Sequence, residues 1–204
     1  EFWRQKLLLN GTGTIQVSLK NVAEYSKDRI NFEKLNKKNY IGVDNLLQNK
    51  MGKVDSTHVP TFGNSIMFKC NDILIGNIRP YLKKIWLADC YGGTNGDVLV
   101  IRITSQKIQP RFLYYILSSD NFFEYDTLNS KGAKMPRGNK ETIMNYNFYL
   151  PALEEQQRIV KILDKFNKLV NDISEGIPAE IEARRKQYEY YRNKLLSFEE
   201  INYD

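Results

Sequence analysis

The chain has 204 residues, 42% hydrophobic and 26% charged, which suffices for one compact domain with its own core. Its apolar runs fall far short of the roughly 20 residues that cross a bilayer, and no secretory signal is visible, so we expect a cytoplasmic protein. The net charge of +6 comes from the first part: 21 Lys and Arg against 13 Asp and Glu through residue 149, then 9 against 11. This asymmetry favours a polyanion as partner of the first part, although a basic surface can also serve solubility alone.

Short apolar runs and turn residues alternate between about residues 17 and 150, a pattern typical of strands and short helices. We predict strands at residues 66–70, 72–78, 84–88, 98–103 and 147–150, and residues 40–43 are strand-like. Pro110 at a first helical turn predicts a helix to Leu117, and a second short helix is expected near Asn139. Without a regular β-α-β alternation, the pattern indicates an α+β domain with a mixed or antiparallel sheet.

After Leu150-Pro151 the pattern becomes helical. Apolar residues repeat at steps of three and four from Leu153 to Ile173, which predicts a helix of about six turns. Gly176-Ile177-Pro178 ends it and starts a second helix. We therefore expect two long C-terminal helices that form a coiled-coil spacer. The heptad seam of the second helix, which we expect to pair with a matched helix, consists of Ile177, Ile181, Arg184, Tyr188, Tyr191, Leu195 and Phe198.

The two ends of the chain resemble each other. Residues 1–8, EFWRQKLL, match residues 189–196, EYYRNKLL, with five identities in eight. Residues 1–9 are therefore interpreted as the tail of an earlier copy of the C-terminal helix, or as an added leader. The chain would then be the second half of a protein with two copies of domain plus helix, the alternative being a natural half-length protein.

Motifs of catalysis are missing from the sequence. No two prolines are adjacent, which excludes an Asn-Pro-Pro-Tyr type of base-methylation motif, and there is no G-x-G-x-x-G or P-loop lysine. No lysine follows an acid by two residues, as in many metal-dependent nucleases. The single histidine, His58, is expected in a surface turn. Cys70 and Cys90 lack metal-ligand spacing, and we expect reduced thiols in or near the core. We expect no catalytic residue, metal or cofactor.

Four segments carry a resemblance to a known family. Residues 150–160, LPALEEQQRIV, resemble the L-P-x-L-x-E-Q-x-x-I pattern that opens the helical region of Type I restriction-modification specificity subunits, the HsdS family. Residues 176–192 resemble the long spacer helix of that family. Residues 71–81 and 132–137 resemble recurrent elements of its target recognition domains, with Asn71 where a glycine is usual.

The resemblance implies a non-catalytic subunit with a DNA-binding target recognition domain at residues 10–150 and a helical spacer and dimerisation region at residues 151–204. Such a chain would read half of an interrupted double-stranded DNA site and dock adenine methyltransferase (modification) subunits and restriction subunits. S-adenosylmethionine, ATP and Mg would belong to those partners only. A second copy, or the other half of the subunit, would complete the assembly. A helix over residues 178–198 would be ~31 Å long, close to the ~34 Å turn of DNA that separates typical half-sites.

Candidate DNA contacts are sought in loops rich in Lys, Arg, Asn and Gly. Residues 129–140 are basic and glycine-flanked, and in residues 79–84 an arginine before a proline could address guanine while a lysine takes phosphate. Residues 27–38 are basic, and residues 45–50 offer amides suited to adenine. The alternative for residues 129–140 is an ordinary solvated loop, although we favour DNA contact there. For residues 79–84 it is a structural turn with Tyr81 in the core, and for residues 27–38 it is solvent-facing scatter. The candidates are Lys27, Arg29, Asn45, Lys50, Arg79, Lys83, Lys84, Lys131, Lys134, Arg137, Asn139 and Lys140.

Two other functions stay open from the sequence. One is a helical scaffold whose basic domain binds an acidic protein, and the other is a cryptic nuclease or RNA-binding enzyme. Salt-dependent binding to an interrupted duplex would favour the specificity subunit, whereas metal-dependent cleavage by the isolated chain would favour the enzyme.

Overall fold

The computed structural model describes residues 15–168, 184, 186 and 187, and the chain divides into two compact units, residues 1–160 and 161–204. The first unit is an α+β domain whose strands all pair in antiparallel fashion within the described residues. The strands are β1 (Ile15–Ser18), β2 (Ala23–Tyr25), β3 (Arg29–Asn31), β4 (Asn64–Phe68), β5 (Ile73–Gly76), β6 (Ile85–Leu87), β7 (Gly92–Thr94), β8 (Val98–Ile103) and β9 (Asn147–Leu150). The helices are α2 (Pro110–Leu117), α3 (Asp120–Leu128) and α4 (Lys140–Met144), with 3-10 turns η1 (Leu19–Asn21), η2 (Phe32–Lys34) and η3 (Pro80–Leu82).

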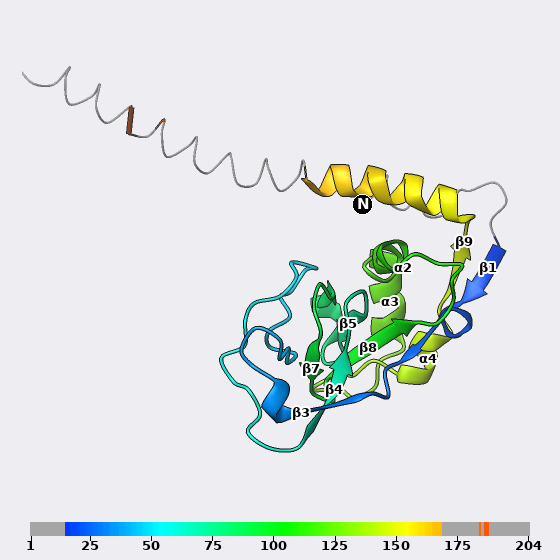
Figure 1. Cartoon of the computed structure of the whole chain (residues 1–204). Helices are drawn as coiled ribbons and strands as arrows, with labels where there is room; N and C mark the ends of the chain where they lie inside the picture. Colours follow the sequence, from blue (N-terminus) through cyan, green and yellow to red (C-terminus); the bar gives the residue numbers. More distant parts are fainter. Residues whose placement is uncertain (1–14, 169–183, 185, 188–204) are drawn as a thin grey trace, which may run out of the picture. The chain divides into compact units, whose positions relative to one another are not determined.

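A four-stranded sheet in the order β2-β8-β5-β6 forms the centre of the domain (Figure 1). Strand β5 pairs with β8 from Ile73↔Ile101 to Gly76↔Val98. All four residues of β5 are buried. Because successive side chains point to opposite faces of a strand, this sheet requires cover on both sides.

One face of the central sheet packs against the second, three-stranded sheet, β3-β4-β7, and against the loop that follows β3. Phe68 of β4 meets Trp86 of β6 edge to face, with ring centroids 5.8 Å apart. The buried cluster on this face comprises Ile41, Leu46, Phe68, Leu74, Trp86, Ala88, Val98 and Val100.

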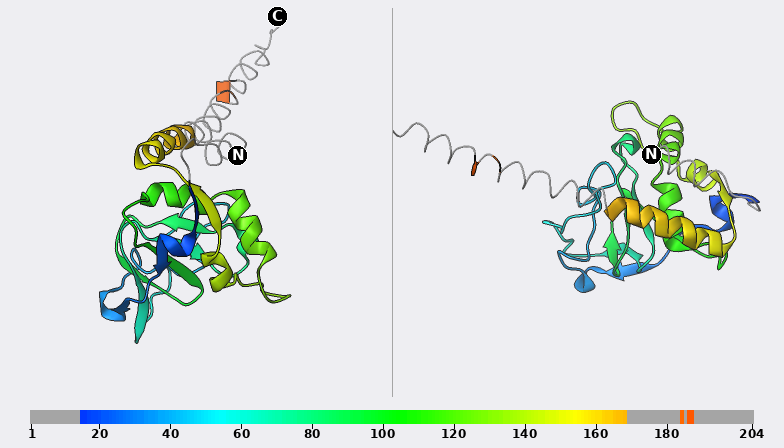
Figure 2. Two further views of the ribbon diagram at one scale, coloured as in Figure 1. Left: turned by 90° about the vertical axis from the view of Figure 1, so that its right-hand side faces the viewer. Right: turned by 90° about the horizontal axis from the view of Figure 1, so that it is seen from above.

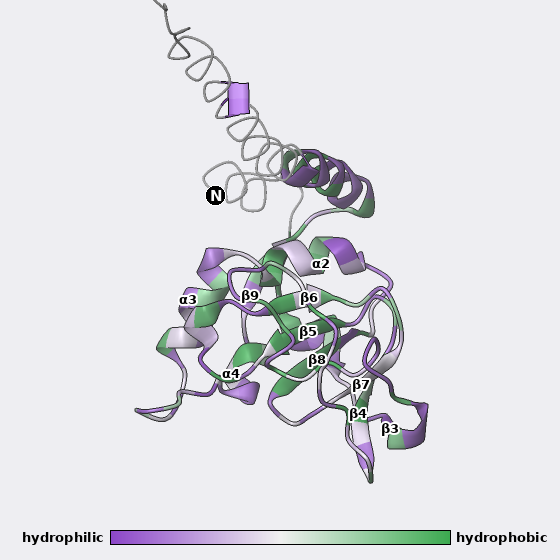
Figure 3. Cartoon of the chain, turned by 90° about the vertical axis from the view of Figure 1, so that its left-hand side faces the viewer, coloured by the Kyte–Doolittle hydropathy of each residue, from purple (hydrophilic) through white to green (hydrophobic). Residues whose placement is uncertain are grey.

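The helices α2 and α3 lie on the other side of β8 and β5, away from β3 and β4 (Figures 1 and 3). Figure 3 shows hydrophobic residues concentrated in β5, β8 and the inner parts of these helices. Pro110 opens α2, where its missing N–H costs nothing. Ser119 caps α3 by accepting a hydrogen bond from the Phe122 amide.

Strands β1 and β9, far apart in the sequence, lie side by side and lead to the helix that starts at residue 153 (Figure 2). The start of this helix is fixed by Gln156, whose side chain is fully buried. Its Oε1 accepts from the Gln109 amide at 2.9 Å, and its Nε2 donates to the carbonyls of Lys107 and Pro151 at 2.9 and 2.8 Å. The glutamine of the L-P-x-L-x-E-Q pattern thus ties the helix start to the domain.

The α+β expectation is confirmed, and the predicted strands correspond to β4, β5, β6, β8 and β9. The helix from Pro110 to Leu117 is observed with the predicted bounds, and the one near Asn139 is α4. The predicted seam residues Ile177, Ile181, Tyr188, Tyr191, Leu195 and Phe198 lie outside the described residues. No helix among the described residues is both long and apolar enough to cross a membrane.

Two predictions were wrong. Residues 40–43 form no strand but only an isolated bridge, Tyr40↔Gly93, because the chain there passes across the glycines of β7. A Cβ on Gly92 would lie 1.9 Å from the Asn39 carbonyl oxygen, so only glycine permits this approach. Cys70 is exposed rather than in or near the core, whereas the partly buried Cys90 packs against the core cluster.

Candidate nucleic-acid interface

Loops from three parts of the sequence meet where β5 ends and β8 begins. The Asn77 amide donates to the Asp97 carbonyl at 2.8 Å, and the Gly138 amide donates to the Asn77 carbonyl at 3.1 Å. The Arg79 amide donates to the Pro136 carbonyl at 2.8 Å. Backbone hydrogen bonds thus hold residues 131–140 against the end of the central sheet.

A further loop is joined to this end of the sheet in the same way. The amides of Asn49 and Lys50 donate to the carbonyls of Leu82 and Lys83, both at 2.9 Å. We call the surface formed by residues 43–50, 77–84, 95–97 and 131–140 the loop surface. It carries eight Lys and Arg, while its exposed or half-exposed acids are Asp44 and Asp97.

The backbone of the loop surface is strained. Asn49, Lys50, Arg79 and Lys83 have φ of 55°, 66°, 54° and 51°, the left-handed region that side chains disfavour. Each such residue costs on the order of 1 to 3 kcal/mol, and residues of this kind cluster at functional sites. Arg79 is doubly restricted, since it also precedes a proline. At Arg79 the left-handed conformation is not explained by packing of the side chain in the core, because this side chain is exposed.

Four of the candidate cations are free to meet an anion. The side chains of Arg79, Lys131, Lys134 and Lys140 are exposed, and no hydrogen bond or ion pair holds them within the described part of the chain. Exposed unpaired cations on ordered loops are suited to phosphate oxygens, and an arginine among them is suited to a guanine edge.

Lys50 and Lys83 share one carboxylate, that of Asp120 at the start of α3. Their Nζ atoms lie 2.9 and 2.6 Å from Asp120 Oδ1. Partial burial raises the pKa of Asp120, but the hydrogen bonds from Lys83 and Lys50 outweigh it and bring the pKa down to about 2. The carboxylate is therefore charged at neutral pH and neutralises part of this lysine pair.

Four other candidates have structural partners. Lys84 Nζ donates to the Val43 carbonyl at 2.7 Å, and Arg137 pairs with Asp97 at 3.0 Å. Asn45 Oδ1 accepts from the Gly42 amide at 2.9 Å, and Asn139 Oδ1 caps α4 by accepting from the amides of Glu141 and Thr142. Lys84 and the two asparagines thus shape the loops that present the free cations.

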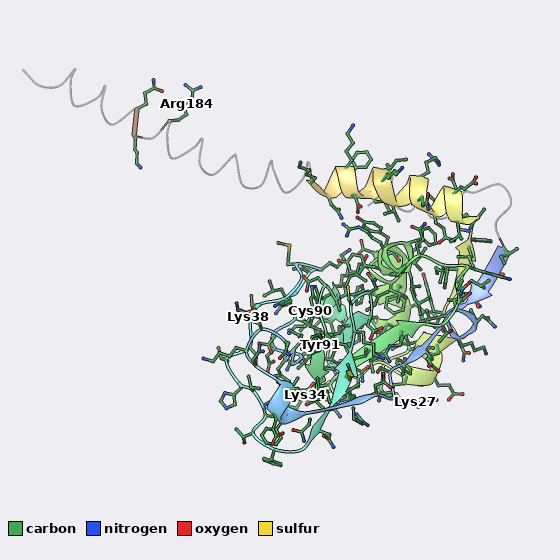
Figure 4. All side chains as sticks on the ribbon, viewed as in Figure 1. Lys27, Lys34, Lys38, Cys90, Tyr91 and Arg184 are labelled. Carbon is green, nitrogen blue, oxygen red and sulfur yellow. The ribbon has the colours of Figure 1, made fainter. Side chains whose placement is uncertain are left out.

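Lys27 and Arg29 are exposed but lie elsewhere. They flank Asp28, which bonds to Arg102 and Lys69 at the opposite end of β5. Arg102 also bonds to Asp72, directly before β5, at 2.7 Å. The structure thus separates these two candidates from the loop surface, and Figure 4 shows Lys27, Lys34 and Lys38 spread apart from one another.

Several residues in or beside the loop surface were not predicted from the sequence. Asp97 and Asp120 hold cations through long-range pairs that no local pattern reveals. The Ser119-Asp120 start of α3 was a detectable signal, because Ser at a helix N-cap followed by an acid in the first turn is typical. Tyr81 and Met135 beside Arg79 are about half exposed, at 49% and 51%. His58 is exposed, as predicted.

The fold defines the class of protein. It is similar to the crystal structure of the HsdS subunit from Thermoanaerobacter tengcongensis, with a TM-score of 0.65, 23% identity, and 86% of this chain and 47% of that chain covered. It is also similar to the S subunit of a type I restriction-modification system from M. genitalium, with a TM-score of 0.57, 18% identity, and coverage of 94% and 48%. The domain therefore has the fold of the S subunits of restriction-modification systems.

The chain belongs to the family of the Type I restriction modification DNA specificity domain, whose model matches residues 11–183. It is 38% identical over 104 residues to the EcoR124I/EcoR124II specificity subunit of Escherichia coli, covering 51% of this chain and 26% of that protein. It is 34% identical over 123 residues to the MpnII specificity subunit of Mycoplasma pneumoniae, covering 55% and 36%. The chain thus spans about half of the solved structures, and the aligned regions are about a quarter to a third of these relatives.

Proposed function

We propose that this chain recognises one half of an interrupted double-stranded DNA site for a Type I restriction-modification complex, and that the loop surface makes the contact. The observation that carries the proposal is the group of four partnerless cations, Arg79, Lys131, Lys134 and Lys140, on a strained and hydrogen-bonded backbone. Membership of a DNA specificity family supports DNA as the polyanion.

Within this proposal the cations have different roles. Arg79 reads a guanine, because its position is fixed by the Pro136 carbonyl and by the following proline. Lys131, Lys134 and Lys140 contact phosphates and set the register. Lys50 and Lys83 contribute less, because Asp120 already neutralises part of their charge. Arg137 pairs with the partly exposed Asp97, and it contributes to DNA binding by exchanging this partner for a phosphate.

The helical region would organise the complex. We propose that residues 151–204 dock modification and restriction subunits and pair with a second copy or with the other half of the subunit, and that the chain has no catalytic role. Cofactors would bind to the partner subunits. Glutamate at Ile181 and Leu195 should abolish the pairing, since charge buried in a seam costs several kcal/mol. Sedimentation of the wild type as a monomer would contradict the pairing.

The decisive experiment measures binding to a random-sequence duplex library, with and without the modification subunit, over a range of salt concentrations. We expect selection of one interrupted sequence and a logarithmic salt slope of about 0.9 per phosphate contact. Binding that is insensitive to salt or prefers an acidic protein would reject the proposal, and metal-dependent cleavage by the isolated chain would indicate an enzyme instead.

A further inference from the structure

A buried carboxyl without a partner lies in α3. The Asp126 residue is 1% exposed, and neither of its side-chain oxygens has a hydrogen-bond partner. The other buried side-chain atom without a partner in the described residues is Asn77 Oδ1, from the loop surface. Buried polar atoms are nearly always hydrogen-bonded, and an isolated buried carboxylate is very costly, so this group requires an explanation.

Both unpartnered side chains have an oxygen next to Gly138, in the loop that carries Lys131, Lys134 and Arg137. A Cβ placed on Gly138 would lie 2.5 Å from Asp126 Oδ1 and 2.9 Å from Asn77 Oδ1. Both oxygens therefore lie close to Gly138, in the space that a side chain there would occupy. The Gly138 amide in turn donates to the Asn77 carbonyl. A side chain at position 138 would force one or both oxygens to move, whereas glycine lets the loop lie directly against the carboxyl.

The surroundings offer Asp126 little charge compensation. Burial raises its pKa to about 7. Tyr25 of β2 faces the same region, and its pKa is raised by burial and then by the charge of Asp126, while its hydroxyl donates to the Lys140 carbonyl. From the loops, Asp97 and Arg137 are paired with each other, and the Lys140 side chain is exposed. A protonated carboxyl is thus accessible near neutral pH.

We propose that Asp126 is a positioning residue for the loop of residues 131–138, and that its protonated carboxyl donates a hydrogen bond to Asn77 Oδ1. This bond would give partners to the unsatisfied Oδ1 of Asn77 and to one oxygen of Asp126. It holds Asn77, and through the Asn77 carbonyl it holds Gly138, at the end of β5. The inference rests on the proposed function in one respect only, namely that the loop contacts DNA.

Loss of the proton has a defined consequence. With Asp126 ionised, two oxygen acceptors face each other beside Gly138, and neither can donate. The folded-state pKa is raised above the ordinary carboxyl value of about 4. The stabilisation is therefore complete below about pH 4 and is lost as the pH rises through about 7. The loop should loosen over this range, and DNA affinity should fall with it.

A different arrangement gives the opposite result. If the Asn77 amide were rotated by half a turn, its Nδ2 would donate to an ionised Asp126. That bond would favour the charged form and lower the pKa of the carboxyl. Acid rather than base would then loosen the loop.

The test is hydrogen exchange of the Lys131, Arg137 and Gly138 amides in the full chain without DNA, from about pH 6 to about pH 8 and corrected for intrinsic rates. In the wild type we expect protection to fall severalfold as pH rises. Asp126→Asn keeps a donor for Asn77 Oδ1 and should hold protection constant, whereas Asp126→Ala should lose it at every pH.

Two controls accompany this series. Glu124→Gln changes an exposed acid on the same helix and should behave like the wild type. His58→Gln removes the single histidine of the sequence and should leave the pH dependence intact. Protection that does not change with pH in the wild type, that rises with pH, or that Asp126→Asn loses like Asp126→Ala would overturn the proposal.

DNA affinity across the same pH range separates this inference from the proposed function. Absence of DNA binding at any pH would reject the proposed function while leaving the exchange result standing. If DNA binds with an affinity independent of pH although the loop loosens, the positioning role is overturned. An affinity that falls with pH in the wild type but not in Asp126→Asn supports both.

Discussion

The two ends of strand β5 differ in whether their cations are paired with acids. At the start, Arg102 bonds to Asp72 and Asp28, and Lys69 completes the group. At the far end, the loop surface leaves Arg79 and three lysines without partners and holds part of its backbone in a left-handed conformation. Both ends are rich in cations, and Lys27 and Arg29 at the start are exposed as well. Of the two ends, as far as the structure describes them, only the loop surface gathers four unpaired cations on a partly left-handed, hydrogen-bonded backbone.

This difference separates a stabilising charge network from a binding surface. Asp72 is buried, with a side chain that is 5% exposed, so its partner Arg102 offsets the cost of desolvation. In the loop surface, no ion pair of this kind offsets the cost of the left-handed backbone among the described residues. This is consistent with selection for contact rather than for stability. The density of basic residues in the sequence does not distinguish the two ends, because the segment with Lys27 and Arg29 beside Asp28 is as basic as the loops are.

The largest effect is expected at the start of β5. Arg102→Met keeps an apolar stem but leaves Asp72 buried without its cation, and it should lower the free energy of unfolding by about 2 to 3 kcal/mol. Urea denaturation at neutral pH measures this loss. The DNA affinity of the folded protein should stay unchanged, and a fall in affinity at constant stability would place Arg102 in the interface.

A loss of similar size, but confined to binding, is expected at the loop surface. Lys131→Glu with Lys134→Glu reverses two exposed charges that have no partner, so DNA affinity should fall roughly a hundredfold with the thermal midpoint unchanged. The matched control is Lys27→Glu with Arg29→Glu at the other end, measured by fluorescence anisotropy at the same salt. Equal losses in the two double variants would remove the distinction between the ends.

Arg79→Gly should change stability and specificity in opposite directions. Glycine adopts φ of 54° without strain, so the free energy of unfolding should rise by about 1 kcal/mol. Loss of the guanidinium should reduce discrimination at one base pair by ~1 to 3 kcal/mol. Calorimetry and binding to single-mismatch duplexes measure the two effects. An equal loss on every sequence would make Arg79 a phosphate contact instead.

The sequence predicts the parts of this domain that local patterns determine. The apolar runs of β5 and β8 and the proline at the start of α2 gave these elements nearly their observed bounds. Strand β7 was missed because Gly92 and Gly93 have low strand propensity. Gly92 is required by the close passage of Asn39, while Ile30 and Ser65 leave little room for a side chain at Gly93. Such a passage depends on tertiary contact.

The loops of the candidate site were predictable from the sequence, but the contacts between them and the pairing of their cations were not. Loops around Arg79 and Lys134 were identified from composition, and the structure joins them through the Pro136 carbonyl. Whether a given lysine is free depends on acids far away in the sequence, as for Lys83, which meets Asp120. Lys131 and Lys83 look alike in the sequence, but only Lys83 of the two has an acidic partner in the described part of the chain.

The smallest expected effect is a gain of affinity, and it tests the reason for the difference between the ends. Asp120→Asn removes the charge that holds Lys50 and Lys83, while the backbone bonds from Asn49 and Lys50 keep both turns in place. DNA affinity at low salt should rise a few-fold, and the salt slope should steepen by up to about 0.9 for each lysine released.

Stability should respond to Asp120→Asn with the opposite sign. Because the pKa of Asp120 is lowered to about 2, its contribution is present above about pH 4 and is lost as pH falls toward 2. The variant should be less stable than the wild type at neutral pH and should lack this acid-dependent loss. The matched control is Asp28→Asn, which likewise removes a carboxylate shared by two cations, but at the start of β5. It releases Lys69, while Arg102 keeps Asp72. If Asp28→Asn raises DNA affinity as much as Asp120→Asn does, free charge anywhere on the domain suffices. If only Asp120→Asn raises it, the position of the charge on the loop surface decides binding.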